Sequence, residues 1–154
     1  MLAQLIDRMM KDQDLCKHLG YDPAVWRVKL NPRGFSPDPV IFANLDKLGH
    51  RLFVIEQAFG IPVMNKVSSG LRNRSLQASI DKAAGREPLV GSKHLTGQAA
   101  DILDLNHNLY AAITDEPELL ELLDVYLEHK DYTRNWCHIQ IVPPKSKKRI
   151  FIPY

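Results

Sequence analysis

The chain has 154 residues, a length that suits one domain, and 45% of them are hydrophobic, enough to form a core. The net charge is only +2, which is too small to indicate nucleic-acid binding by bulk electrostatics. No apolar stretch is long enough to span a bilayer, so we expect no membrane insertion. These values argue against a nucleic-acid-binding protein and a membrane-spanning protein. They leave a globular domain whose motifs must indicate its function.

The cysteines and the N-terminal residues indicate the compartment. Two cysteines, Cys16 and Cys137, are fewer than a small secreted domain held by disulfides usually has. No CxxC pair exists, which excludes a cysteine-based zinc ribbon, and Cys137 lies in an apolar run, which predicts a buried thiol. Charged residues interrupt the apolar residues of the first fifteen positions, so we expect no signal peptide and folding in the cytoplasm.

The first sixty residues are predicted to contain two helices separated by a loop. Residues 1–17 have apolar side chains at helical spacing, and Gly20 marks the end of that helix. Residues 21–39 are rich in proline and glycine and predict a long, irregular but packed loop. Asp38 and Pro39 have the N-cap and N1 pattern of a second helix, whose apolar periodicity continues to Phe59 and ends at Gly60.

The later residues predict short strands mixed with helices. A β-like segment at 63–68 precedes a helix at 74–84 and an apolar strand at 98–105. Asp115 and Glu118 have the spacing of a capping box for a helix that reaches about Lys130. Residues 135–142 alternate like a half-buried strand, and residues 149–152 could pair with them as a hairpin.

These elements together predict the fold class. We expect an α+β fold in one domain over residues 1–154, with a small antiparallel sheet flanked by helices. The helices of the N-terminal part cover about residues 1–60, and the chemically informative motifs lie in the region of about 63–154.

The most informative motif is SKHLTGQAAD at residues 92–101. His94 ends a loop, Gly97 allows a tight entry into the next strand, and Asp101 lies inside that apolar strand. A buried carboxylate is costly without a partner, and a metal ion is one such partner. The alternative is that Asp101 caps or salt-bridges another group while His94 is a surface residue.

A second histidine lies in the alternating strand WCHIQI at residues 136–141. His138 on its own could be a hydrogen-bonded core residue. Together with His94 and Asp101, however, it would give a site of two nitrogens and one oxygen. Three protein ligands leave the fourth position of tetrahedral zinc open, as in catalytic rather than structural zinc sites.

The pattern SxHxxGxAxD at 92–101, followed by WxH at 136–138, resembles the zinc D-alanyl-D-alanine carboxypeptidases and peptidoglycan endopeptidases, which include phage endolysins. The Hedgehog signalling domain shares their fold. Ser69-Gly70-Leu71-Arg72 with Gln77 is similar to the SGYR…Q segment of that family, although Leu71 replaces its tyrosine. The resemblance covers about residues 63–142, and the first sixty residues contain no part of it.

The resemblance implies a role for each matched residue. His94, Asp101 and His138 would bind Zn²⁺, and Arg72 would bind a substrate carboxylate or carbonyl. Ser92 would hydrogen-bond the substrate near the metal, and Gln77 would support the pocket. The reaction would be metal-assisted hydrolysis, in which a general base takes a proton from the attacking water.

The general base is where the sequence departs from the better-known members of the family. They have Glu or Asp three residues before the last histidine ligand, and this chain has Asn135, which cannot act as a base. Asp131, Glu128 and His129 lie upstream, and of these we predict Asp131 as the catalytic base. His107 is expected to be a surface residue.

The resemblance implies a protein that cuts stem peptides or cross-links of bacterial peptidoglycan. With no expected signal peptide, a phage or prophage lysis enzyme fits best, made as a cytoplasmic monomer and released to the wall by a holin-type partner. Two alternatives stay open. One is a non-catalytic structural or binding protein that keeps the zinc fold, which the Asn135 departure motivates, and the other is a cytoplasmic dipeptidase acting on free D-Ala-D-Ala.

Overall fold

The N-terminal part contains more helix than the sequence predicts. The computed structural model describes residues 1–153, and its first four helices are α1 (Leu2–Lys11), α2 (Gln13–His18), α3 (Pro23–Leu30) and α4 (Pro39–Phe59). The predicted helix over 1–17 is broken at Asp12, whose side chain accepts a hydrogen bond from the backbone N–H of Leu15 (3.0 Å) and begins α2. The predicted loop over 21–39 contains α3, which Asp22 caps and Pro23 begins.

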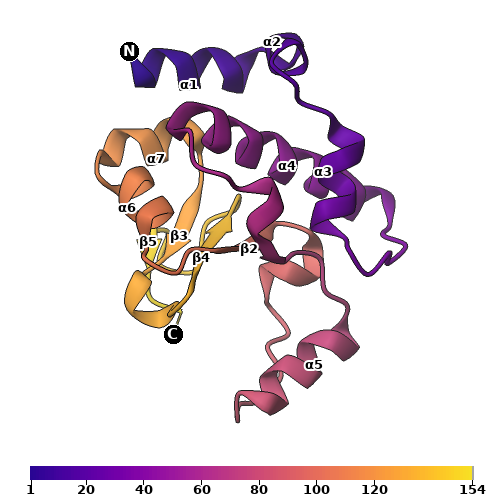
Figure 1. The fold of residues 1–154 in the computed structure, drawn as a ribbon. Coiled ribbons are helices and arrows are strands. Elements are labelled where there is room, and N and C mark those ends of the chain that lie inside the picture. Colours follow the sequence, from indigo (N-terminus) through magenta and orange to yellow (C-terminus); the bar gives the residue numbers. More distant parts are fainter. Residues whose placement is uncertain (154) are drawn as a thin grey trace.

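Helix α4 lies at the centre of the molecule and is confirmed as predicted. The Asp38 side chain accepts a hydrogen bond from the backbone N–H of Ile41 (2.9 Å), and Gly60 ends the helix in the left-handed conformation with φ 64°. Its buried face packs against α1 and α3, and against the two later helices α6 (Asn108–Thr114) and α7 (Pro117–Leu123) (Figure 1). None of the helices within residues 1–153 is long and apolar enough to cross a membrane.

The sheet has five short strands in the order β1-β2-β4-β3-β5. Their bounds are β1 (Val67–Ser69), β2 (Ala99–Leu103), β3 (Tyr126–Glu128), β4 (Trp136–Gln140) and β5 (Ile150–Phe151). The first four strands pair antiparallel, whereas β5 pairs parallel with β3. The α+β class with a small sheet flanked by helices is therefore confirmed, but the sheet is mixed rather than purely antiparallel. The predicted hairpin of 149–152 with 135–142 is wrong, because β2 and β3 occupy the two edges of β4.

Two further elements differ from the prediction. The expected helix over 115–130 is replaced by the shorter helix α7 and the strand β3, and α7 ends where Asp124 adopts the left-handed conformation with φ 51°. The expected capping box does not form, because α7 begins at Pro117 with no side-chain cap. The segment at 63–68 is mostly a 3-10 turn, η1 (Met64–Lys66), before β1. Helix α5 (Arg74–Ala83) forms as predicted.

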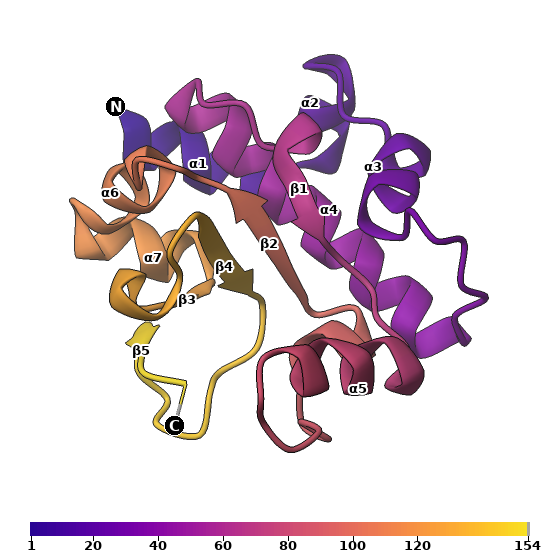
Figure 2. The same cartoon turned by 60° about the horizontal axis from the view of Figure 1, so that its bottom comes forward.

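The two faces of the sheet have different environments. One face contributes apolar side chains, including Ala100, Leu127, Cys137 and Ile139, to the core that α4 also lines. Cys137 is thus a buried free thiol, as expected. The opposite face bears Asp101, His138 and Gln140. Helix α5 lies beside the start of β2, on the side of the molecule away from α1 (Figure 2).

Candidate metal centre

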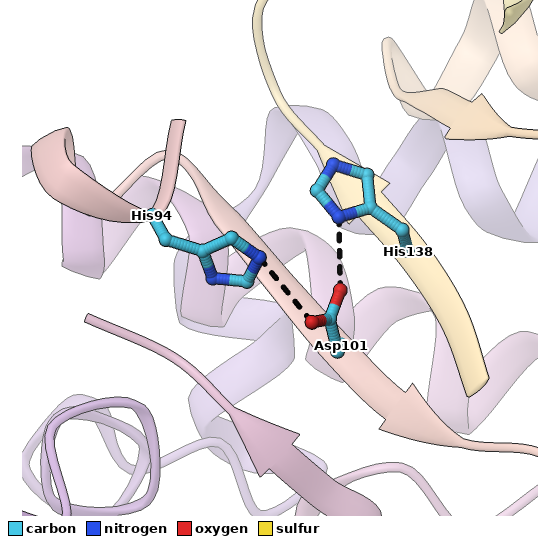
Figure 3. A group of neighbouring side chains, drawn as sticks. All are labelled: His94, Asp101 and His138. Atoms are coloured by element: carbon cyan, nitrogen blue, oxygen red, sulfur yellow. Dashed lines mark hydrogen bonds and ion pairs between the residues drawn. The ribbon is translucent and has the colours of Figure 1, made fainter. Parts of the chain in front are cut away.

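The structure brings the three predicted metal ligands together. His94 lies in the 3-10 turn η2 (Lys93–Thr96), Asp101 in β2 and His138 in β4, and each offers one ligand atom within 4.8 Å of the others. The His94 Nε2 is 3.4 Å from Asp101 Oδ2, and the His138 Nδ1 is 2.9 Å from Asp101 Oδ1 (Figure 3). All three residues are buried. This buried group could bind a metal ion.

Strand register and one glycine explain this convergence. Asp101 and His138 are directly paired in the antiparallel ladder of β2 and β4, so their side chains project from the same face. Gly97, with φ 70°, ends η2 and turns the chain into β2. A Cβ at this glycine would be 3.1 Å from Leu45 Cγ and 3.2 Å from Ile41 Cγ2 on α4, closer than ordinary contacts. The turn that brings His94 close to Asp101 therefore needs a glycine at residue 97, where the backbone packs directly against α4.

Hydrogen bonds to the remaining ring nitrogens define which atoms face the centre. The His94 Nδ1 is 2.9 Å from the Gly70 carbonyl, so it donates a proton there and leaves Nε2 toward Asp101. Gln140 donates through Nε2 to the Val142 carbonyl (2.9 Å), so its Oε1 accepts from His138 Nε2 (2.9 Å) and leaves His138 Nδ1 toward Asp101. Such partners orient metal-ligating histidines. The sequence analysis did not identify Gly70 or Gln140 in this role.

The electrostatics of the group favour an ionised carboxylate. Burial by itself would raise the pKa of Asp101, but the charge of His94 and hydrogen bonds from His138 and His94 outweigh it and hold that pKa well below its usual range. For His138, burial opposes protonation, yet the hydrogen bond and charge of Asp101 raise its pKa. An anionic oxygen between two imidazoles is a donor set that suits a divalent metal such as zinc.

Arg72 and Gln77, predicted as substrate-binding residues, lie beside the centre. The backbone N–H of Arg72 donates to the His94 carbonyl (3.0 Å). Its guanidinium donates to Ser69 Oγ (3.0 Å), Gln77 Oε1 (3.0 Å) and Asp101 Oδ2 (3.2 Å). Arg72 therefore holds the carboxylate from the side opposite His138, and Gln77 holds Arg72.

Asp81 extends this network and was not identified from the sequence. Its fully buried carboxylate accepts hydrogen bonds from Gln77 Nε2 (3.1 Å), Arg86 Nε (2.7 Å) and the backbone N–H of Leu89 (2.7 Å). Asp81 lies four residues after Gln77 on α5, a spacing that places both on one helix face and could have suggested the pair. The network connects the candidate centre to the loop that follows α5.

A pocket of about 460 Å³ opens over the centre. Its lining includes the metal group, Arg72, Gln77 and Ser92, so the structure places every predicted substrate-binding residue there. Apolar side chains from α5, the following loop and the C-terminal third complete the wall, and they are Ile80, Ala84, Leu89, Tyr132, Trp136 and Pro153. A second pocket of about 350 Å³, around His50 among the N-terminal helices, does not include any of the three predicted ligands.

The structure does not bring Asp131 to this pocket. Its exposed side chain lies 3.6 Å from His129 Nδ1 and points to that neighbour rather than to the metal group. Asn135 is exposed just before β4, and its carbonyl accepts from the Asp104 backbone N–H (2.8 Å). His107 is half-buried at the start of α6 with φ 55°, and it is not part of the metal-ligand group.

Comparison with known proteins gives no relative from which a role could be transferred. No family model matches the chain, and no curated protein or solved structure matches it. The resemblance to the zinc peptidases thus depends on the motifs alone, and the chemistry of the site has to be argued from its own geometry.

Proposed function

We propose that this protein is a zinc-dependent hydrolase that cuts peptide bonds in the stem peptides or cross-links of bacterial peptidoglycan. The observation that supports it most is the buried His94–Asp101–His138 group at the base of an open pocket. The peptidoglycan substrate is inferred from the motifs around that group, which resemble those of cell-wall peptidases. A pocket that reaches the protein surface allows part of a polymer to approach the three ligands.

Zinc is the metal that we propose for this group. Two imidazole nitrogens and one carboxylate oxygen form a known type of catalytic zinc site with a remaining position for water or substrate. The Gly70 carbonyl and the Gln140 amide orient both imidazoles so that the ring nitrogen that would bind zinc, after loss of any proton that it donates to Asp101, already points toward that carboxylate. A bound zinc ion would supply Lewis acidity, which polarises a carbonyl and makes water more acidic.

The chain's own residues would bind and orient the substrate. Arg72 uses three of the five guanidinium N–H bonds on Ser69, Gln77 and Asp101, which leaves others for a substrate carbonyl or carboxylate. Ser92 lies on the same pocket wall as His94 and would offer a hydroxyl to the peptide. Leu89, Tyr132 and Trp136 on the pocket wall would contact apolar parts of the peptide.

The biological setting that we propose is lysis of a bacterial host by a phage or prophage. The enzyme would accumulate as a cytoplasmic monomer and reach its substrate through a holin-type partner. We infer this setting from the proposed peptidoglycan substrate.

Digestion of stripped peptidoglycan by the purified, zinc-loaded protein tests this function. Mass spectrometry of muropeptides before and after digestion should reveal cleaved stem peptides or cross-links, with new amino termini. The variant His94→Ala should lose both zinc and activity. His18→Ala, at an exposed position on α2, is the matched control and should keep both. Full zinc retention by His94→Ala would contradict the ligand assignment.

One observation favours a second function. The position where related peptidases have their base is Asn135, and this residue lies outside the pocket lining, so the same centre could serve a non-catalytic zinc protein. Zinc binding without any release from peptidoglycan would favour that alternative. Hydrolysis of free D-Ala-D-Ala, but not of the polymer, would instead indicate a dipeptidase.

A further inference from the structure

The proposed hydrolysis needs a group that takes a proton from water and returns it to the leaving amine. Neither Asn135, which has no basic atom, nor Asp131, which lies outside the pocket, is placed for that task. Within residues 1–153, the carboxylates that line the pocket belong to Asp101 and Glu128. Asp101 is already engaged by three cationic or imidazole groups, so Glu128 is the residue to consider.

The register of the sheet places Glu128 next to the metal group. Strands β3 and β4 pair Tyr126 with Gln140 and Leu127 with Ile139, which puts residue 128 opposite His138. On the other side of β4, His138 pairs with Asp101. Adjacent strands are about 4.8 Å apart, so Asp101, His138 and Glu128 form one row across three neighbouring strands.

Side-chain parity confirms that this row is on the pocket face. Leu127 and Ile139 belong to the hydrophobic core, so Glu128 and His138, one residue away along each strand, project to the opposite face. Glu128 pairs with Phe151 on β5, and the Phe151 ring lies 6.0 Å from the His138 ring. Glu128, His138 and the Phe151 ring therefore lie on the same face of the sheet.

Glu128 lies beside the metal group without being part of it. Its carboxylate is not among the ligand atoms that lie within 4.8 Å of one another, so the structure offers three ligands and one neighbouring acid. Glu128 is half-buried. A carboxylate that lines the pocket beside the three ligands, without belonging to their group, is placed for proton transfer.

We propose that Glu128 is the catalytic proton-transfer residue of this site, an inference that rests on the proposed function. Its carboxylate takes one proton from a water molecule while the water oxygen forms a bond to the scissile carbonyl carbon. The same proton then passes from the Glu128 carboxyl to the amide nitrogen as the C–N bond breaks. The products are a carboxylic acid and an amine, and Glu128 returns to its starting state.

The test compares Glu128→Gln with Asp131→Asn in the full chain. Both variants replace a carboxylate by an amide of the same shape, one inside the pocket and one outside it. For Glu128→Gln we expect an unchanged unfolding temperature and a zinc affinity, measured by competition with a chelator, within about threefold of wild type. We expect kcat on peptidoglycan fragments to fall by about 10²–10⁴-fold with little change in KM. Asp131→Asn should resemble the wild type in every measurement.

A second variant separates proton transfer from packing. Glu128→Asp keeps the carboxylate on a shorter side chain and should recover part of the lost kcat, which a purely structural role would not produce. The inference is overturned if Glu128→Gln stays active, if its zinc affinity falls as it would for a fourth ligand, or if only KM changes. A wild-type protein that binds zinc but releases nothing would instead overturn the proposed function.

Discussion

Gly70→Ala is a small change that should weaken a metal site in which Gly70 is not a ligand. Gly70 contacts the end of α3, where the backbone N–H of Leu71 donates to the Leu30 carbonyl oxygen (2.7 Å). A Cβ at residue 70 would be 2.8 Å from the Leu30 carbonyl carbon and 3.0 Å from its Cα, and closer still to the oxygen. These are backbone atoms, so the strand-to-helix contact must move. The Gly70 carbonyl, which orients His94, would move with it.

The expected magnitude follows from these contacts. Overpacking against a fixed backbone costs about 1–3 kcal/mol, which corresponds to a fall of about 2–12 °C in the unfolding temperature of a chain this long. Displacing the carbonyl that holds a ligand histidine typically weakens metal affinity by about 10–100-fold. We therefore expect Gly70→Ala to lower the unfolding temperature and also to weaken zinc binding by about that factor.

The assay combines thermal unfolding of the zinc-free protein with zinc titration against a competing chelator. Gly91→Ala is the matched control, because no atom lies within 4 Å of its added Cβ and its backbone is not left-handed. This control should stay within about 1 kcal/mol of wild type and bind zinc normally. If Gly70→Ala binds zinc as tightly as Gly91→Ala does, then α3 does not position His94 through Gly70, and the reasoning fails.

Three other variants probe the network around the centre. Gln140→Leu should weaken zinc binding by about 10–100-fold in chelator competition because it removes the acceptor for His138 Nε2–H, whereas Gln4→Leu, on the exposed face of α1, should not. Asp81→Asn should lower the free energy of unfolding by about 1–3 kcal/mol in urea titration, since the donors from Arg86 and Leu89 lose the charged acceptor that the buried carboxylate provides. Asp7→Asn on α1, which removes only the ion pair with the exposed Lys11, should change the free energy of unfolding by less than about 0.5 kcal/mol. An equal loss of stability in the Asp81 and Asp7 variants would contradict the role given to Asp81. Burial lowers the pKa of His50 in the folded protein. The neutral His50 imidazole therefore contributes fully to the free energy of unfolding above the pKa of about 6.5 that histidine has in the unfolded chain. This contribution is lost as the pH falls toward the pKa of His50 in the folded protein. As the pH falls below about 6.5, the zinc-free wild type should therefore lose stability relative to His50→Gln, in which the other histidines are unchanged; equal pH slopes of the two proteins would refute this.

Local signals in the sequence predicted the elements and residues that depend on neighbours along the chain. Asp38, Pro39 and Gly60 are a cap, a first-turn proline and a left-handed terminator, and they set the bounds of α4 without tertiary contacts. The motif at 92–101 and His138 identified the three residues of the candidate centre. The helix bounds needed only spacing and residue type, because helix caps are short-range properties, whereas the choice of metal ligands also used the resemblance to the zinc peptidases.

The same kind of reasoning failed where local signals compete. Asp22 and Pro23 begin α3 in a segment whose many prolines and glycines favoured a loop. The apolar residues after Pro117 continue into β3 after a turn at Asp124, and helical spacing alone did not reveal that break. Both elements bury side chains in the hydrophobic core, Trp26 and Leu30 from α3 and Leu127 from β3, and this packing stabilises them.

Only the tertiary structure could decide which side chains share the pocket. Glu128 and Asp131 are three residues apart, and Asp131 was the base predicted from the sequence, but the pairing of β3 with β4 turns Glu128 toward His138, whereas Asp131 follows the strand in an exposed turn. Gly70 contacts His94, 24 residues later in the chain, whereas Gln140 shares a strand face with His138 and Asp81 shares a helix face with Gln77. The sequence by itself determined which groups can bind a metal, and strand register determined which groups surround it, because register depends on long-range backbone pairing that no local pattern specifies.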